Sequence, residues 1–219
     1  EAIEVYEEME TIGALQGRGA EYYQKLGYAL QKNKKYAEAI DAYLKADTLK
    51  PDNIWNNRHL AICYRLNRNY QAALSYYKKV EEATPEDTNV IFHIGSCLAE
   101  LGQYEEAANY FFKLDFIESN CIKAWRGIGW CSFISRKYEQ AMKYYEKIIE
   151  QKPLAIDYMN AGHVAWTMGD IQKAAALYGK SITANGNRER FLEMFRKDKE
   201  ALLKQGIQEE DIPLMLDLL

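Results

Sequence analysis

Residues 122–153 read IKAWRGIGWCSFISRKYEQAMKYYEKIIEQKP, and the same arrangement of small and aromatic residues returns along most of the chain. Within this stretch Gly129, Ala141 and Tyr145 occupy fixed offsets. The equivalent positions, 33 or 34 residues apart, are Gly27, Ala61, Gly95 and Gly162; Ala39, Ala73, Ala107 and Ala174; and Tyr43, Tyr77, Phe111 and Tyr178. A 34-residue period of this composition predicts an all-α solenoid of stacked helix–turn–helix repeats.

Each repeat contains two helical patterns separated by a short polar turn. Leu60, Ala61 and Tyr64 are three or four residues apart and share one helix face, as do Ala73 and Tyr77 on the next helix. We expect the small residues to let the two helices approach closely, with the aromatic residue filling the space beside them. A bulky replacement of Ala73 would therefore overpack the contact.

Prolines and capping residues mark the ends of the helices. Pro51, Pro85 and Pro153 each follow a second helix, where a helix has to stop. Asn53 and Asp87 lie just before the next first helix and have side chains suited to capping it. Gly102 and Gly169 mark two turns within repeats.

The period divides the chain into segments with different expected roles. These are the second helix of a truncated preceding repeat (1–16), repeats 1 to 5 (20–53, 54–87, 88–121, 122–154 and 155–187), and C-terminal capping helices (188–219). Because the chain starts at Glu1, we expect a fragment of a longer array or a processed form. The apolar tail is expected to fold back on the capping helix, with docking into another copy as the alternative.

Composition and charge exclude several functional classes. The formal net charge of −4 argues against a general nucleic-acid binder. No apolar run approaches the length of a membrane span, so membrane insertion is not expected. Cys63, Cys97 and Cys131 occupy one repeat offset, and no Cys-x-x-Cys pair occurs. We therefore predict no disulfide and no metal site, and unpaired thiols favour a reducing, cytoplasmic location.

No catalytic constellation is evident. His59 and His93 share one offset but have no third ligand at helical spacing. Gly127-Ile128-Gly129 lies within a helical pattern, follows no strand and lacks the third glycine of a dinucleotide loop. We predict a protein that is not an enzyme and needs no cofactor.

The pattern resembles the tetratricopeptide repeat family. Residues 122–153 carry that family's Trp, Gly, Tyr, Ala, aromatic and Pro positions as Trp125, Gly129, Tyr138, Ala141, Tyr145 and Pro153. Ser119 and Ile171 depart from the pattern but leave its register intact. The resemblance implies a solenoid whose concave face, lined by the first helices, binds other proteins.

The concave positions implied by the resemblance are rich in aromatic and basic residues. They include Trp55, Arg58, Ile62, Arg65, Phe92, Ser96, Lys123, Arg126, Trp130, Phe133, Met159, His163 and Trp166. Repeat 1 contributes a more polar set, Glu21, Gln24, Tyr28 and Gln31. Trp, Tyr and Arg dominate binding hot spots, although some of these aromatics are equally expected to pack between neighbouring helices.

We therefore predict a scaffold or adaptor that binds a peptide or protein surface in the concave groove. The expected partner is apolar and carries acidic groups, which Arg58, Arg65 and Arg126 would pair with. Two alternatives stay open: a structural segment that self-associates through its ends, and a regulatory, ligand-sensing fragment of a larger enzyme.

Overall fold

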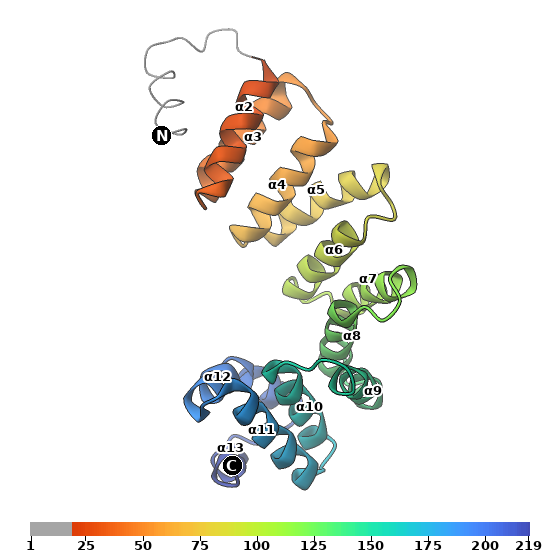
Figure 1. Ribbon diagram of the computed structural model, residues 1–219, viewed down its shortest axis with the longest axis vertical. Helices are drawn as coiled ribbons and strands as arrows, with labels where there is room; N and C mark the ends of the chain where they lie inside the picture. The colour runs from red at the N-terminus through yellow and green to blue at the C-terminus, as the bar shows by residue number, and fades with distance from the viewer. Residues whose placement is uncertain (1–18) are drawn as a thin grey trace. The chain divides into compact units, whose positions relative to one another are not determined.

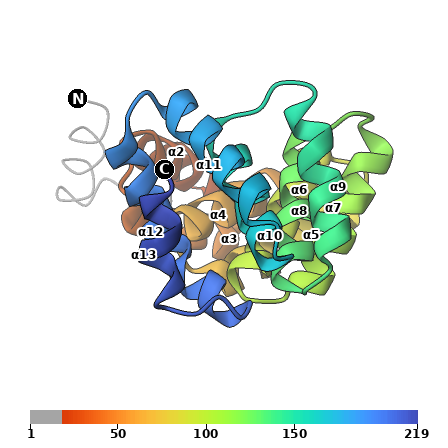
Figure 2. The same cartoon turned by 90° about the horizontal axis from the view of Figure 1, so that it is seen from below.

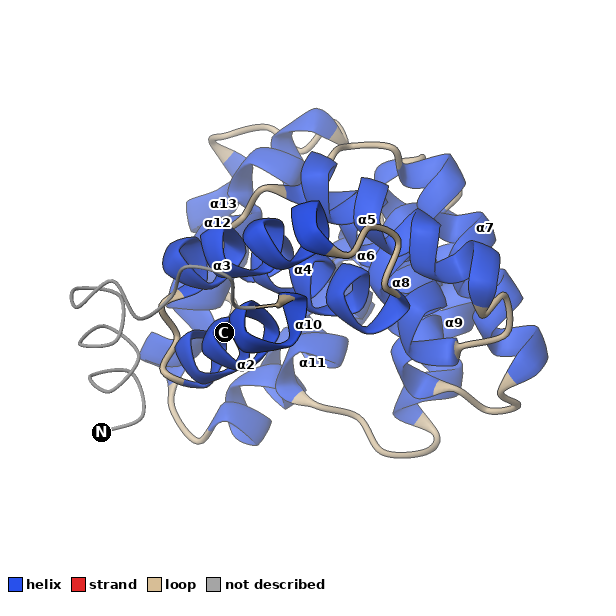
Figure 3. Cartoon of the chain, turned by 90° about the horizontal axis from the view of Figure 1, so that it is seen from above, coloured by secondary structure: helices blue, strands red, loops and turns tan. Residues whose placement is uncertain are grey.

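The computed structural model describes residues 19–219, and every regular element within that range is a helix (Figure 3). The twelve helices are α2 (Ala20–Lys32), α3 (Tyr36–Leu49), α4 (Ile54–Leu66), α5 (Tyr70–Ala83), α6 (Thr88–Glu100), α7 (Tyr104–Ile117), α8 (Ile122–Ile134), α9 (Tyr138–Ile149), α10 (Ala155–Thr167), α11 (Ile171–Asn185), α12 (Arg188–Lys204) and α13 (Asp211–Asp217). The predicted helix at residues 1–16 lies outside the described residues.

The helices form two compact units, one ending at Gly102 and the other spanning Gln103–Leu219. In the first unit each helix from α2 to α6 packs against the next one along the chain (Figure 1). In the second unit the same sequential packing runs from α7 to α12. This arrangement is an α-solenoid, as the period predicted.

Glycine and tyrosine at fixed offsets set the distance between paired helices. A Cβ atom added to Gly129 would lie 2.9 Å from the ring of Tyr145, and one added to Gly162 would lie 2.5 Å from the ring of Tyr178. Both rings are fully buried. The aromatic ring therefore lies directly on the glycine, a closer contact than the one expected from sequence, where the ring was placed beside the small residues.

The turn between paired helices has one conformation throughout. Its residue with positive φ is Lys34, Arg68, Gly102, Arg136 or Gly169, with φ between 60° and 84°. Only two of the five are glycines, so three turns place a basic residue in the left-handed region, which disfavours a side chain. The residue types at these three turns do not mark a left-handed conformation, although the sequence predicts a short polar turn in each repeat.

Side-chain caps begin several of the helices. The Asn53 side chain accepts a hydrogen bond from the Asn56 N–H at 2.9 Å, and Asp87 accepts from the Asn89 and Val90 N–H groups at 3.0 and 3.1 Å. The capping predicted for these two residues is confirmed.

The C-terminal helices α12 and α13 lie beside α10 and α11 (Figures 1 and 2). Phe191, Phe195 and Leu202 form the buried side of α12, as expected from their spacing. The tail folds back on this helix, because Arg188 Nη2 donates a hydrogen bond of 2.6 Å to the Leu216 carbonyl.

Candidate functional site

An open aromatic cluster lies on the first unit, where α2 meets α4. The rings of Tyr28 and Trp55 are 6.2 Å apart, and 41% and 42% of these residues is exposed. A pocket of about 330 Å³ opens beside them, lined also by Glu21, Gln24 and Lys25. Large, partly exposed aromatic side chains at a pocket are suited to burying apolar contact area on binding.

His59 forms the floor of this cluster. Its ring centroid is 4.0 Å from that of Trp55, and its Nδ1 lies 2.8 Å from Gln31 Oε1. Because an amide oxygen can only accept, Nδ1 carries the proton. Desolvation, followed by the charges of Arg58 and Lys32, lowers the His59 pKa to about 4. The imidazole is therefore neutral at pH 7 and acts as a packing element.

Arg58 is paired with a carboxylate of its own chain. Its Nη1 lies 2.9 Å from Asp87 Oδ2, and that carboxylate also caps α6. Desolvation acts in the opposite direction, but the Val90 N–H and Arg58 together lower the pKa of Asp87 below its ordinary value. Arg58 thus ties α4 to the start of α6.

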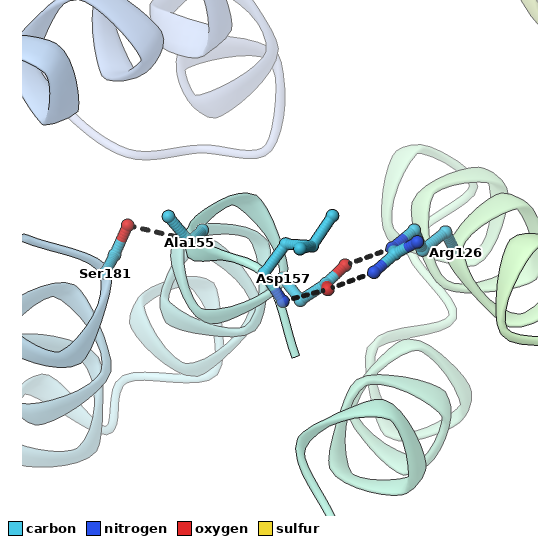
Figure 4. Close-up of polar contacts among 5 residues, drawn as sticks. Arg126, Ala155, Asp157 and Ser181 are labelled. Atoms are coloured by element: carbon cyan, nitrogen blue, oxygen red, sulfur yellow. Dashed lines mark hydrogen bonds and ion pairs between the residues drawn. The ribbon is translucent and has the colours of Figure 1, made fainter. Parts of the chain in front are cut away.

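Arg126 makes the same kind of link in the second unit, with better geometry (Figure 4). Its Nε and Nη2 donate to Asp157 Oδ1 and Oδ2, both at 2.7 Å. The Leu154 N–H donates to Asp157 Oδ2 at 2.7 Å, so the carboxylate also closes the first turn of α10. The hydrogen bonds to Asp157 raise the pKa of Arg126. Sequence reasoning assigned Arg58 and Arg126 to a partner's acids, whereas the structure engages both internally.

Four of the predicted groove residues are buried in the second unit. Phe133, Met159, His163 and Trp166 are all nearly inaccessible. The prediction that they line an open groove is therefore not supported by their positions in the structure.

For His163 and Trp166, the covering element is α12, which packs against α10. Phe195 packs against the rings of His163 and Trp166 at 5.4 and 6.4 Å. Asp198 Oδ2 is 3.4 Å from His163 Nε2. At the far end of α12, Gln205 accepts a hydrogen bond from the Tyr138 hydroxyl at 2.9 Å. The capping helix thus covers the face that sequence reasoning left open.

The remaining predicted residues are partly exposed and divide between the units. Ile62, Arg65, Phe92 and Ser96 belong to the first unit, and Lys123 and Trp130 to the second. Arg65 Nε is buried and has no hydrogen-bond acceptor within residues 19–219. Tyr28, which sequence reasoning left out of the principal set, is the more prominent contributor. The sequence could have indicated Tyr28, because it occupies the same repeat offset as the predicted groove residues Ile62 and Ser96.

Metal binding and thiol reactivity each place structural requirements on the side chains of the described residues. No cluster of three or more His, Cys, Asp or Glu side chains suitable for a metal is found there. Burial raises the pKa of the Cys63, Cys97 and Cys131 thiols to about 12, 11 and 12, which disfavours the nucleophilic thiolate. Within residues 19–219, no helix is both long and apolar enough to cross a bilayer.

The stacked helix pairs and an aromatic-lined inner face define a helical repeat protein of the protein-interaction class. Tetratricopeptide repeat sequence models match residues 20–53, 65–131, 122–153 and 158–188. The chain belongs to the tetratricopeptide repeat family, whose members are generally non-catalytic scaffolds.

Solved structures with the same fold share little sequence with this chain. YrrB, described as a tetratricopeptide repeat protein with an unusual peptide-binding site, is 20% identical, with a TM-score of 0.68 over 86% of this chain and 97% of its own. MamA residues 41 to the end, from Desulfovibrio magneticus RS-1, is 16% identical, with a TM-score of 0.71 over 77% and 96%. A repeat protein from Parabacteroides merdae is 20% identical, with a TM-score of 0.66 over 99% and 90%. No curated protein sequence matches this chain significantly.

Proposed function

We propose that this protein is a non-enzymatic, cytoplasmic scaffold that binds a peptide or protein surface on the inner side of its first unit. The observation that carries the proposal is the open pair formed by Tyr28 and Trp55 beside an apolar pocket. Phe133, Met159 and Trp166, which hold related positions in the second unit, are covered by the chain itself. The first unit therefore offers the accessible aromatic surface. The relative described as having a peptide-binding site makes peptide recognition a reasonable use of the fold.

The charge around the pocket favours a partner with an acidic group. Lys32 Nζ lies 5.0 Å from the Tyr28 ring centroid and has no ion pair within the described chain. A ring holds an ammonium group in place without neutralising it, so Lys32 can still meet a carboxylate. We expect a peptide with an aromatic or large aliphatic side chain next to Asp or Glu.

A peptide array tests this proposal. It contains short peptides with one Trp, Phe or Leu flanked by Asp, and matched peptides flanked by Lys. The expected result is preferential capture of the acidic set. Trp55→Ala should weaken capture at least about tenfold, the scale of a hot-spot loss. Circular dichroism checks that the variant, which also loses its ring contacts with Tyr43 and His59, remains folded. Phe116→Ala, which removes an 89% exposed aromatic from the second unit, is the matched control.

Two results would contradict the proposal. One is equal capture by the wild type and Trp55→Ala, which would remove the aromatic pair from the binding surface. The other is equal capture of the acidic and basic sets, which would remove the charge preference.

A further inference from the structure

The last helix, α13, is apolar on two sides. Ile212 and Met215 face inward and are buried. Leu214 and Leu218, four residues apart on the other side, are 64% and 62% exposed. One turn of helix therefore presents two large aliphatic side chains to solvent. Packing within the described chain does not explain why these positions are leucine.

These leucines border a pocket of about 500 Å³ in the second unit. Trp166, Ile171 and Met215 line it with them, and Trp166 is itself held in place by its stacking on Phe195. A pocket with a buried indole at its base and exposed aliphatic side chains at its edge has the composition of an anchor site for one inserted apolar side chain.

Two carboxylates give this pocket its charge. Asp211 and Asp217 both line it, and neither has an ion-pair partner within residues 19–219. Two basic residues of α12 reach the tail: Lys199 is paired with a carboxylate there, whereas Arg188 bonds a neutral carbonyl and keeps its positive charge. Arg188 donates to the Leu216 carbonyl at 2.6 Å, and Lys199 Nζ lies 2.6 Å from Glu209. The pocket is therefore apolar inside, and its edge carries two carboxylates against the single guanidinium of Arg188.

We propose that this C-terminal pocket is a second docking surface, which binds a cationic amphipathic segment of a partner protein. One apolar side chain of the segment enters the pocket between Leu214 and Leu218, the two exposed leucines at its edge. Flanking Lys or Arg residues pair with Asp211 and Asp217. The charge preference is opposite to that proposed for the Trp55 surface, and the two proposals stand or fall separately.

The test uses the full chain and two synthetic helical peptides of about 18 residues, long enough for helix formation on binding. One contains only Leu and Lys with leucines along one face, and the other replaces every Lys with Glu. Affinity is measured by fluorescence anisotropy of the labelled peptides at two salt concentrations. We expect the Lys peptide to bind and the Glu peptide not to bind, with weaker binding at higher salt.

Two matched pairs of variants separate a specific site from general attraction to an acidic protein. Asp211→Asn with Asp217→Asn should weaken binding about tenfold. Glu139→Gln with Glu150→Gln makes the same change in net charge on α9 and should leave binding unchanged. Leu214→Ser with Leu218→Ser should abolish binding, whereas Phe116→Ser should not. Circular dichroism checks that each variant is folded.

Three outcomes would overturn the proposal. Equal loss in the Asp211/Asp217 and Glu139/Glu150 pairs would mean attraction by net charge alone. Retained binding in the leucine variant would place the contact elsewhere. Concentration-dependent dimerisation of the wild type that Leu214→Ser with Leu218→Ser removes would identify the occupant as a second copy of this chain.

Discussion

Asp157 and Arg126 form a two-pronged ion pair in which both hydrogen bonds are 2.7 Å long and the carboxylate is 1% exposed. The pair joins α8 to the first turn of α10. Replacing Arg126 with Leu would leave the carboxylate buried with a single N–H donor, and we expect a loss of about 3 kcal/mol in the free energy of unfolding.

Arg58→Leu is the matched comparison for this prediction. Asp87 is more exposed and keeps two backbone N–H donors, so we expect a loss of only about 1 kcal/mol. Urea denaturation of both variants measures the difference. Equal losses would mean that the bidentate geometry adds nothing to stability.

Gly162 and Gly179 offer a direct test of the contact between glycine and tyrosine. A Cβ at Gly162 would meet the Tyr178 ring, so Gly162→Ala should destabilise the protein by about 1–3 kcal/mol. A Cβ at Gly179 on the neighbouring helix would meet nothing within 4 Å. Gly179→Ala should therefore stabilise α11 by up to about 1 kcal/mol.

Thermal unfolding of both variants checks this pair of predictions. If Gly162→Ala were tolerated as well as Gly179→Ala, contact with the aromatic ring would not be the reason that this position of the repeat requires a small residue.

His59 should make the stability of the protein depend on pH. Desolvation lowers its pKa in the folded state to about 4, while an unfolded chain binds the proton near pH 6.5. Between these values the unfolded state binds more protons. Stability is therefore fully present above about pH 6.5 and falls as the pH drops towards 4.

His59→Gln removes this titrating group. The difference in unfolding free energy between the wild type and the variant, measured from pH 4 to 7, should shrink as the pH falls. Parallel curves would contradict the assignment of a neutral, partly buried imidazole.

Phe195 tests whether α12 seals the inner side of α10. Phe195→Ala should cost about 3–5 kcal/mol, because the ring packs on His163, Trp166 and Tyr178. Arg196→Ala, at an exposed neighbouring position, should change stability by less than about 0.5 kcal/mol. Chemical denaturation followed by tryptophan fluorescence measures both, and similar values would mean that α12 is only loosely attached.

The repeat period predicted the helices well because each offset has its own steric requirement. Gly129 and Tyr145 show this: one residue has to be small because the other lies on it. The sequence predicted a short polar turn within each repeat, but not that Lys34 and Arg68 would adopt the left-handed conformation there.

The candidate site was less predictable because it depends on contacts between residues that the repeat pattern does not relate to one another. The partner of Arg126 is supplied by the next helix pair, and no local pattern marks Asp157 as that partner. The burial of His163 and Trp166 depends on where α12 lies, and α12 does not follow the repeat. An offset therefore predicts which way a side chain points but not what covers it.

The Arg126–Asp157 link also restricts how such a chain can be rearranged. It takes one partner from residues 122–154 and the other from residues 155–187, so neither segment carries the complete pair. Recombination that exchanged or duplicated segments would strand Asp157 as an unneutralised charge in the interior. Despite a nearly uniform spacing, the segments are consequently not interchangeable modules, and their order is part of what keeps the protein folded.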